Sequence, residues 1–129
     1  MPIADRPASI RTARVLICLD SLLFLALGAV AASGAHPSYP LGSATSRLIA
    51  VSSFVVACLL AAFAWLLGRQ SRQAFVGAVG LLSVMILASV FDEFGLADLA
   101  FAAAMGLPLL LLVRARAWYL RPEAERPYA

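Results

Sequence analysis

The chain has 129 residues, of which 63% are hydrophobic and 13% charged, against roughly 45–50% and about 25% in an average soluble domain. The mean hydropathy of +0.92 excludes an ordinary soluble protein. Disorder is also excluded, because disordered segments are poor in apolar residues and rich in charge. The net charge of +3 comes from arginines at the ends of apolar stretches, a pattern typical of membrane topology signals and not of a nucleic-acid surface.

The first apolar stretch covers residues 15–32 and ends before a loop that contains Pro37, Pro40 and Gly42. It predicts a transmembrane helix, because about 17–25 apolar residues are needed to span the hydrocarbon core. A basic start and a small-residue end are also typical of a cleaved signal peptide. Asp20 within the stretch and the apolar stretches that follow favour a retained helix.

Three further apolar stretches predict transmembrane helices at 48–67, 74–90 and 94–113. The short connection 69–73 between the second and third requires an antiparallel helical hairpin. Pro108 predicts a kink in the last helix, because its ring removes one backbone hydrogen bond and crowds the preceding turn. We therefore expect an all-α membrane protein, a single domain over residues 1–129 that forms an antiparallel bundle of four transmembrane helices.

The arginines decide the expected orientation of this bundle. All except Arg47 fall on one side of the four-span arrangement, namely Arg6, Arg11, Arg14, Arg69, Arg72, Arg114, Arg116, Arg121 and Arg126. Because basic residues accumulate on the cytoplasmic side, both termini are predicted to be cytoplasmic, in a multi-pass protein of a bacterial cytoplasmic (inner) membrane. The aromatic residues then expected at the cytoplasmic interface are Trp65, Trp118 and Tyr119.

Asp20 is the one acidic residue well inside a predicted span, roughly 8 Å from its cytoplasmic end at 1.5 Å per residue. A mid-membrane Asp costs about 2.5–3.5 kcal/mol on insertion scales, so its side chain should face the interior and find a partner. Arg69 and Arg114 end their helices at a depth from which they can reach it. Two interpretations stay open: a buried ion pair or protonated, hydrogen-bonded carboxyl, and a proton or cation relay.

The opposite side carries the acidic segment 91–98 and the single base Arg47. Asp92 and Glu93 lie where the fourth helix begins, and negative charge there complements the helix dipole. Asp98 lies one turn further in, so we expect an ion pair between Arg47 and Asp98. A divalent cation held by the three acids is the alternative, but the sequence supplies no ordered set of further oxygen ligands, and we predict no metal site.

Small residues recur at helical spacing in each predicted span: Ser21, Gly28 and Ala32; Ser53, Ala57 and Ala61; Gly77 and Gly80; Ala102 and Gly106. Such stripes allow helix backbones to approach closely in lipid. They favour packing between helices of one chain, with a dimerisation face as the alternative.

The sequence lacks the residues that common cofactor-binding and catalytic motifs require. The single histidine, His36, lies in a loop, so two axial histidine ligands for an intramembrane haem are missing, and the sequence lacks paired cysteines, an HExxH motif and a Gly-rich phosphate loop. We predict no catalytic residue and no cofactor. In length, helix number and an acid in the first helix, the chain resembles small four-helix multidrug exporters. Those carry a glutamate where this chain has Asp20 and lack its strong arginine bias, so no binding role is carried over.

The expected function is therefore that of a non-enzymatic accessory or packing subunit, or a small homo-oligomer. Its partners would be the lipid bilayer and other membrane subunits or further copies of the chain, and not nucleic acid. The alternative is a proton-coupled small-molecule transporter or channel built from several copies, with Asp20 as the titrating residue.

Overall fold

The computed structural model describes residues 7–37, 40–91 and 95–120. These residues form α1 (Ala8–Ser33), α2 (Ala44–Leu67), α3 (Arg72–Val90), α4 (Leu96–Arg114) and the short α5 (Arg116–Tyr119). The first four are long and apolar enough to cross a membrane. The chain is thus an all-α, multi-pass membrane protein built on a four-helix bundle, and no strand occurs in its described part.

Three helices begin earlier than the apolar pattern predicts, α3 by only two residues, at Arg72 and not at Ala74. α1 begins at Ala8 and not at Val15, because alanine and arginine are favourable helix formers and extend the helix beyond the apolar stretch. α2 begins at Ala44 and not at Leu48: the Ser43 hydroxyl accepts a hydrogen bond from the backbone N–H of Ser46 at 3.1 Å. This is an N-cap interaction, which satisfies one of the free donors at a helix start.

The connections are set by local backbone geometry. Gly34 ends α1 at φ +68°, and a Cβ there would lie 2.7 Å from the Cβ of Leu41, so only glycine fits this left-handed position without strain. In the α2–α3 turn, Ser71 caps α3 by accepting from the N–H of Ala74 at 3.3 Å. Gln70, the residue before Ser71, has a left-handed backbone conformation with φ +58°.

α1 packs along α2 through small residues. The Ser21 hydroxyl donates a hydrogen bond to the carbonyl of Ala57 at 2.8 Å. Two turns further along α1, a Cβ at Gly28 would meet the Phe54 ring at 3.0 Å. The predicted small-residue stripes of α1 and α2 therefore meet each other within the chain at these positions, as expected for close helix contact in lipid.

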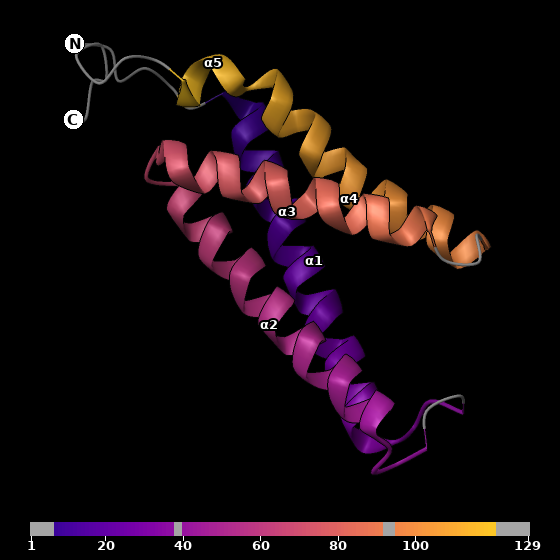
Figure 1. Cartoon of the computed structure of the whole chain (residues 1–129). Coiled ribbons are helices and arrows are strands. Elements are labelled where there is room, and N and C mark those ends of the chain that lie inside the picture. The colour runs from indigo at the N-terminus through magenta and orange to yellow at the C-terminus, as the bar shows by residue number, and fades with distance from the viewer. Residues whose placement is uncertain (1–6, 38–39, 92–94, 121–129) are drawn as a thin grey trace.

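α4 packs against both α1 and α3, whereas α2 and α3 touch much less. Phe24 of α1 and Phe101 of α4 make an edge-to-face contact with ring centroids 5.7 Å apart. Between α2 and α3, the Phe63 ring lies so close to Gly77 that a Cβ there would approach it to 2.7 Å. The α1–α2 and α3–α4 pairs diverge with distance from α5 (Figure 1).

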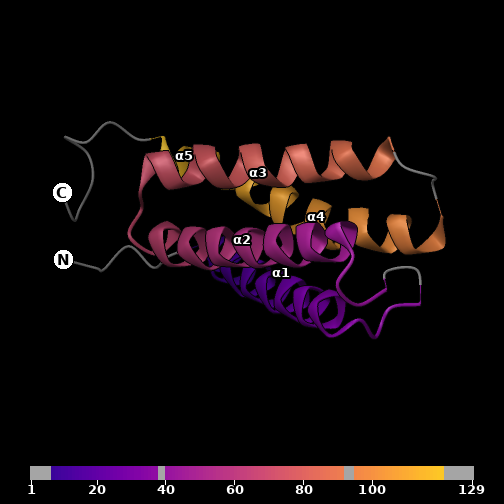
Figure 2. The same cartoon turned by 60° about the horizontal axis from the view of Figure 1, so that its bottom comes forward.

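The start of α1, the α2–α3 turn and α5 lie together at one end of the molecule (Figure 2), which we call the closed end. Tyr119 is fully buried there: its ring stacks on Phe75 at 5.0 Å between centroids, and its hydroxyl donates to the carbonyl of Leu67 at 3.3 Å. The Gln70 amide donates to the carbonyl of Trp118 at 2.9 Å. Tyr119 therefore joins α5 to α2 and α3. Its ring is buried within the closed end, whereas the sequence predicts it among the aromatic residues of the membrane interface.

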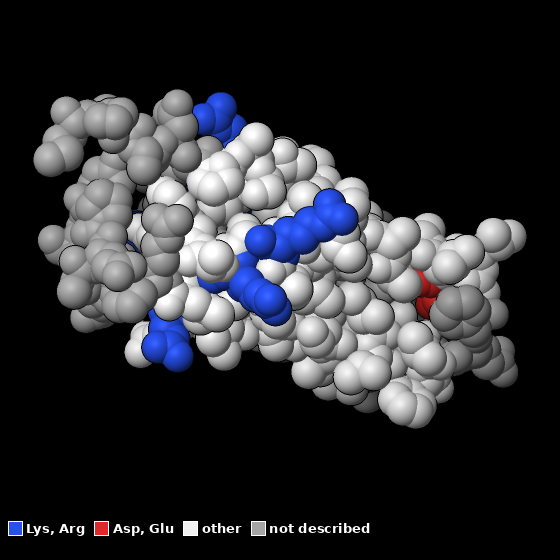
Figure 3. Space-filling view, turned by 90° about the horizontal axis from the view of Figure 1, so that it is seen from above, with Lys and Arg blue, Asp and Glu red and all other residues white. Residues whose placement is uncertain are grey.

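The opposite end, formed by the α1–α2 loop and the starts of α2 and α4, we call the open end. Arginine side chains gather toward the closed end, and an acidic patch lies at the other (Figure 3). Arg11, Arg14, Arg69, Arg72, Arg114 and Arg116 lie in the elements of the closed end, and Arg47 and Asp98 in those of the open end. The separation of charge along the bundle agrees with the predicted antiparallel arrangement of the spans.

Candidate functional site

Asp20 lies on the face of α1 that is turned toward the interior. Its side chain is 6% exposed, and its Oδ2 atom is buried with no hydrogen-bond partner. Asp20 precedes Leu23, Phe24 and Leu27 by three, four and seven residues, so it shares their face of the helix, one turn nearer the closed end. A buried polar atom without a partner is expensive in free energy, which makes this position the most unusual in the bundle.

The predicted partners of Asp20 lie elsewhere. The Arg69 guanidinium stacks over the Trp65 ring at 4.1 Å from its centroid, and Arg114 is exposed in the last turn of α4. Neither forms an ion pair with Asp20, whose Oδ2 stays unpartnered within the described residues. The protonated form and the relay remain predictions.

Arg14 is the interior arginine that the sequence did not single out. Its Nε donates to the carbonyl of Ala64 at 2.8 Å, and a Cβ at Gly68 would lie 2.7 Å from its guanidinium carbon. The last carbonyls of a helix have no intrahelical donors, and a cation there also complements the helix dipole. Arg14 thus stabilises the end of α2, in a position that became available because α1 starts before Arg14.

The expected ion pair between Arg47 and Asp98 is not formed. Asp98 Oδ2 accepts a hydrogen bond from the backbone N–H of Gly95 at 2.9 Å, at the start of its own helix. Arg47 lies on α2 beside the α1–α2 loop, where it lines a separate cavity. The physical reason is that the α1–α2 and α3–α4 pairs diverge toward this end (Figure 1), which separates α2 from α4.

Pro108 is buried within α4, and the helix continues beyond it to Arg114; the kink stays a prediction. Because proline has no N–H, the carbonyl of Ala104 loses its usual intrahelical donor. Met105, fully buried, lies one turn beyond Phe101. Since α1 and α4 are antiparallel and Phe24 faces Phe101, Asp20 lies roughly level with the Ala104–Pro108 segment.

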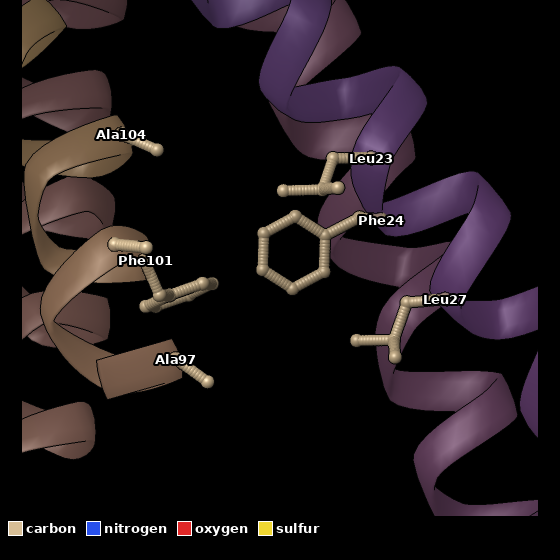
Figure 4. Close-up of a pocket in the computed structure, with 7 residues that line it drawn as sticks. Leu23, Phe24, Leu27, Ala97, Phe101 and Ala104 are labelled. Atoms are coloured by element: carbon tan, nitrogen blue, oxygen red, sulfur yellow. The ribbon is translucent and has the colours of Figure 1, made fainter. Parts of the chain in front are cut away.

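A groove of about 420 Å³ lies between α1 and α4 at the open end (Figure 4). It is lined by hydrocarbon side chains: Leu23, Phe24, Leu27, Ala97, Ala100, Phe101 and Ala104. Its volume is within the range of ligand pockets, about 300–1,000 Å³. Asp20 lies one helical turn beyond the inner end of this groove, toward the closed end, and is not part of its lining. The groove therefore offers contact to apolar groups alone.

The described residues contain no cluster of three or more His, Cys, Asp or Glu side chains that could hold a metal ion. Asp92 and Glu93, which the sequence interpretation grouped with Asp98, lie outside the described residues. His36 lies in the α1–α2 loop. No family model, curated protein or solved structure matches the chain.

Proposed function

We propose that the chain is a non-enzymatic accessory or packing subunit, or a small homo-oligomer, of a bacterial cytoplasmic membrane. The observation that carries the proposal is the apolar interior of the diverging bundle. At the open end, the space between α1 and α4 is a hydrocarbon-lined groove. Such a surface can bind apolar groups but offers no polar atoms for catalysis or for ion coordination.

Four serine side chains of the spans support the same proposal. The hydroxyls of Ser21 and Ser46 donate to carbonyls of the neighbouring helix, at 2.8 and 2.5 Å. Those of Ser52 and Ser89 donate to carbonyls of their own helix at 3.1 Å. These hydroxyls serve helix packing and backbone satisfaction, which is the common role of serine in membrane helices, and they do not line a continuous polar path in the described bundle.

The outward face of α3 supports association with another chain. A Cβ at Gly80 would meet nothing within 4 Å, and Val76 and Val84, one turn on either side, are 58% and 62% exposed. A small residue between two branched ones lets a partner helix approach closely. In this proposal, α3 presents a face that the chain's own helices leave uncovered.

Affinity purification in mild detergent tests the proposal, followed by measurement of the mass of the particle. We expect a complex with a stoichiometric membrane partner or with further copies of the chain. A lone monomer at every protein concentration, in detergent and in nanodiscs, would contradict it. Gly80→Leu should weaken the association, whereas Ala29→Leu, which places the same side chain at an exposed position of α1, is the matched control.

The orientation belongs to the same proposal, with both termini in the cytoplasm. In a variant with Cys18 and Cys58 changed to Ala, a cysteine introduced at Ser43 should react with an impermeant reagent from outside. One introduced at Ser71 should react only from the cytoplasmic side. Labelling of both from one side would overturn the four-span arrangement, and the reverse pattern of labelling would overturn the orientation.

A proton-coupled transporter or channel is the second candidate, and the unpartnered Oδ2 of Asp20 favours it. Buried ionisable residues in membrane helices often mark proton or ion pathways. In proteoliposomes, a transport activity that requires a proton gradient should be lost in Asp20→Asn and kept in Asp98→Asn. Unchanged transport in Asp20→Asn would remove Asp20 from the mechanism.

A further inference from the structure

A second cavity, of about 520 Å³, lies at the open end where α2 begins. One wall is a single face of α2, made of residues at i, i+3, i+4 and i+7: Arg47, Ala50, Val51 and Phe54. Ala32 at the end of α1 and the loop residues Leu41 and Gly42 form the rest, together with Ser46. We call this cavity the Arg47 trough.

The trough has a polar end and an apolar end. Arg47 lies in the first turn of α2, where the span begins, and Phe54 lies about 10 Å deeper along the helix axis. Between them the wall is hydrocarbon, from Ala50 and Val51. Along the helix, a cation at the membrane boundary is followed by an apolar surface. This order is complementary to a phospholipid, in which an anionic phosphate is followed by acyl chains.

The Arg47 guanidinium has no hydrogen bond or ion pair with another described residue. Asp98, its predicted partner, is engaged with the backbone of Gly95, and the other arginines of the described chain lie in elements of the closed end. An unpaired guanidinium at a membrane boundary attracts a phosphate, which its planar set of donors can bind through two parallel hydrogen bonds. Each basic residue near an anionic lipid surface contributes about 1 kcal/mol.

The size of the trough favours a lipid over a second helix as the molecule that occupies it. An α-helix is about 10–12 Å in diameter and rises about 5.4 Å per turn, so one turn already fills roughly the whole trough. A transmembrane helix of about 20 residues would therefore find too little space along its length. A free phosphate would use Arg47 but leave the apolar wall uncovered. A phospholipid with one acyl chain in the trough uses both.

We propose that the Arg47 trough is a binding site for a bilayer phospholipid, with the phosphate on Arg47 and one acyl chain along Ala50, Val51 and Phe54. The neighbouring wall, formed by Ala32 and Leu41, contacts the other side of the acyl chain. The lipid covers a surface that α1 and α2 leave open and connects the α1–α2 loop to the bilayer. This site is separate from the α1–α4 groove and does not depend on the oligomeric state.

Native mass spectrometry of the full chain in mild detergent tests the proposal, with dioleoyl-phosphatidylglycerol as the probe. Arg47→Gln should weaken binding of this lipid about fivefold. Arg72→Gln, which removes an arginine at the closed end, should leave it within about twofold. Dioleoylglycerol, which has the chains without the phosphate, and glycerophosphoglycerol, which has the phosphate without the chains, should both bind more weakly than the intact lipid.

The apolar wall has its own pair of variants. Ala32→Phe places a ring in the trough and should weaken lipid binding, whereas Ala29→Phe, at an exposed position on the same helix but outside the trough, should not. Equal losses in Arg47→Gln and Arg72→Gln, undiminished binding in Ala32→Phe, or headgroup binding as tight as lipid binding would each overturn the proposal. Should Arg47→Gln fail to fold, a photoactivatable acyl chain on the wild-type protein decides the question: crosslinks must concentrate at residues 50–54, and their absence there refutes the site.

Discussion

Replacing Asp20 with leucine is the most direct test of the interior of the bundle. Leucine has the same branched connectivity of heavy atoms as aspartate, so the change removes the polarity of the side chain at the cost of a moderately larger volume. The Asp20 Oδ2 atom is buried and has no hydrogen-bond partner, and the side chain is 6% exposed. Wild-type Asp20 therefore carries a desolvation cost that no described contact repays.

The magnitude follows from that single orphaned atom. Leaving a buried polar group unsatisfied costs about 1–3 kcal/mol, and Asp20→Leu removes the group. We expect the free energy of unfolding to rise by about 1–3 kcal/mol, which corresponds to a few degrees in melting temperature for a chain of this length. Asp20→Asn, which removes the charge but keeps two polar atoms in the same place, should give a smaller change.

Thermal unfolding in mild detergent, followed by circular dichroism, measures both variants beside the wild type. The Asp98→Leu variant is the control, because Asp98 accepts the Gly95 N–H at 2.9 Å and its loss should destabilise. If Asp20→Leu instead lowers stability by as much as an ordinary core truncation, about 2–5 kcal/mol, Asp20 has a strong partner and the argument from its orphaned oxygen is refuted.

Three further comparisons between variants test single contacts. Gly77→Ala and Gly80→Ala gain the same helix propensity, but only the Cβ at position 77 meets the Phe63 ring, at 2.7 Å. In detergent unfolding, the Gly77→Ala variant should therefore be less stable than the Gly80→Ala variant by about 1–3 kcal/mol. Equal stabilities of the two variants would contradict the contact. Arg14→Leu breaks the 2.8 Å bond to the Ala64 carbonyl and should destabilise by about 1–2 kcal/mol, whereas exposed Arg11→Leu should stay within about 0.5 kcal/mol. The losses in Arg47→Leu and Asp98→Leu should add in the double variant to within about 0.5 kcal/mol; a coupling above that would place the two side chains in contact.

The four spans could be predicted from the sequence because hydropathy and length decide them almost alone. The helix ends could not, since they depend on caps. The start of α2 follows from the Ser43 hydroxyl, a signal that is present in the sequence but weaker than the apolar run that begins at Leu48. The apolar pattern does not predict the start of α1, because arginine marks the boundary of an apolar span and is also a good helix former.

The candidate site was less predictable, since it depends on which helices touch. Composition indicates that Asp20 should be buried, and burial was correct. Choosing Arg69 and Arg114 as its partners required knowledge of helix rotation and of competing contacts, such as the Trp65 ring that Arg69 covers. The pairing of Arg47 with Asp98 assumed parallel helix axes, whereas the two helix pairs diverge toward the open end (Figure 1).

The two ends of the bundle differ in the contacts that connect the α1–α2 pair with the rest of the chain. At the closed end, Gln70 and Tyr119 bond to backbone carbonyls across the α2–α3 turn and α5, and such directional bonds fix distance and orientation together. Toward the open end, α1 and α4 meet through the Phe24–Phe101 contact and then separate around hydrocarbon, which is non-directional. The angle between the helix pairs is therefore set by directional bonds at the closed end and by packing alone beside the groove. Asp20, one turn nearer the closed end than Phe24, is the acidic residue of α1 that lies closest to the groove along the helix.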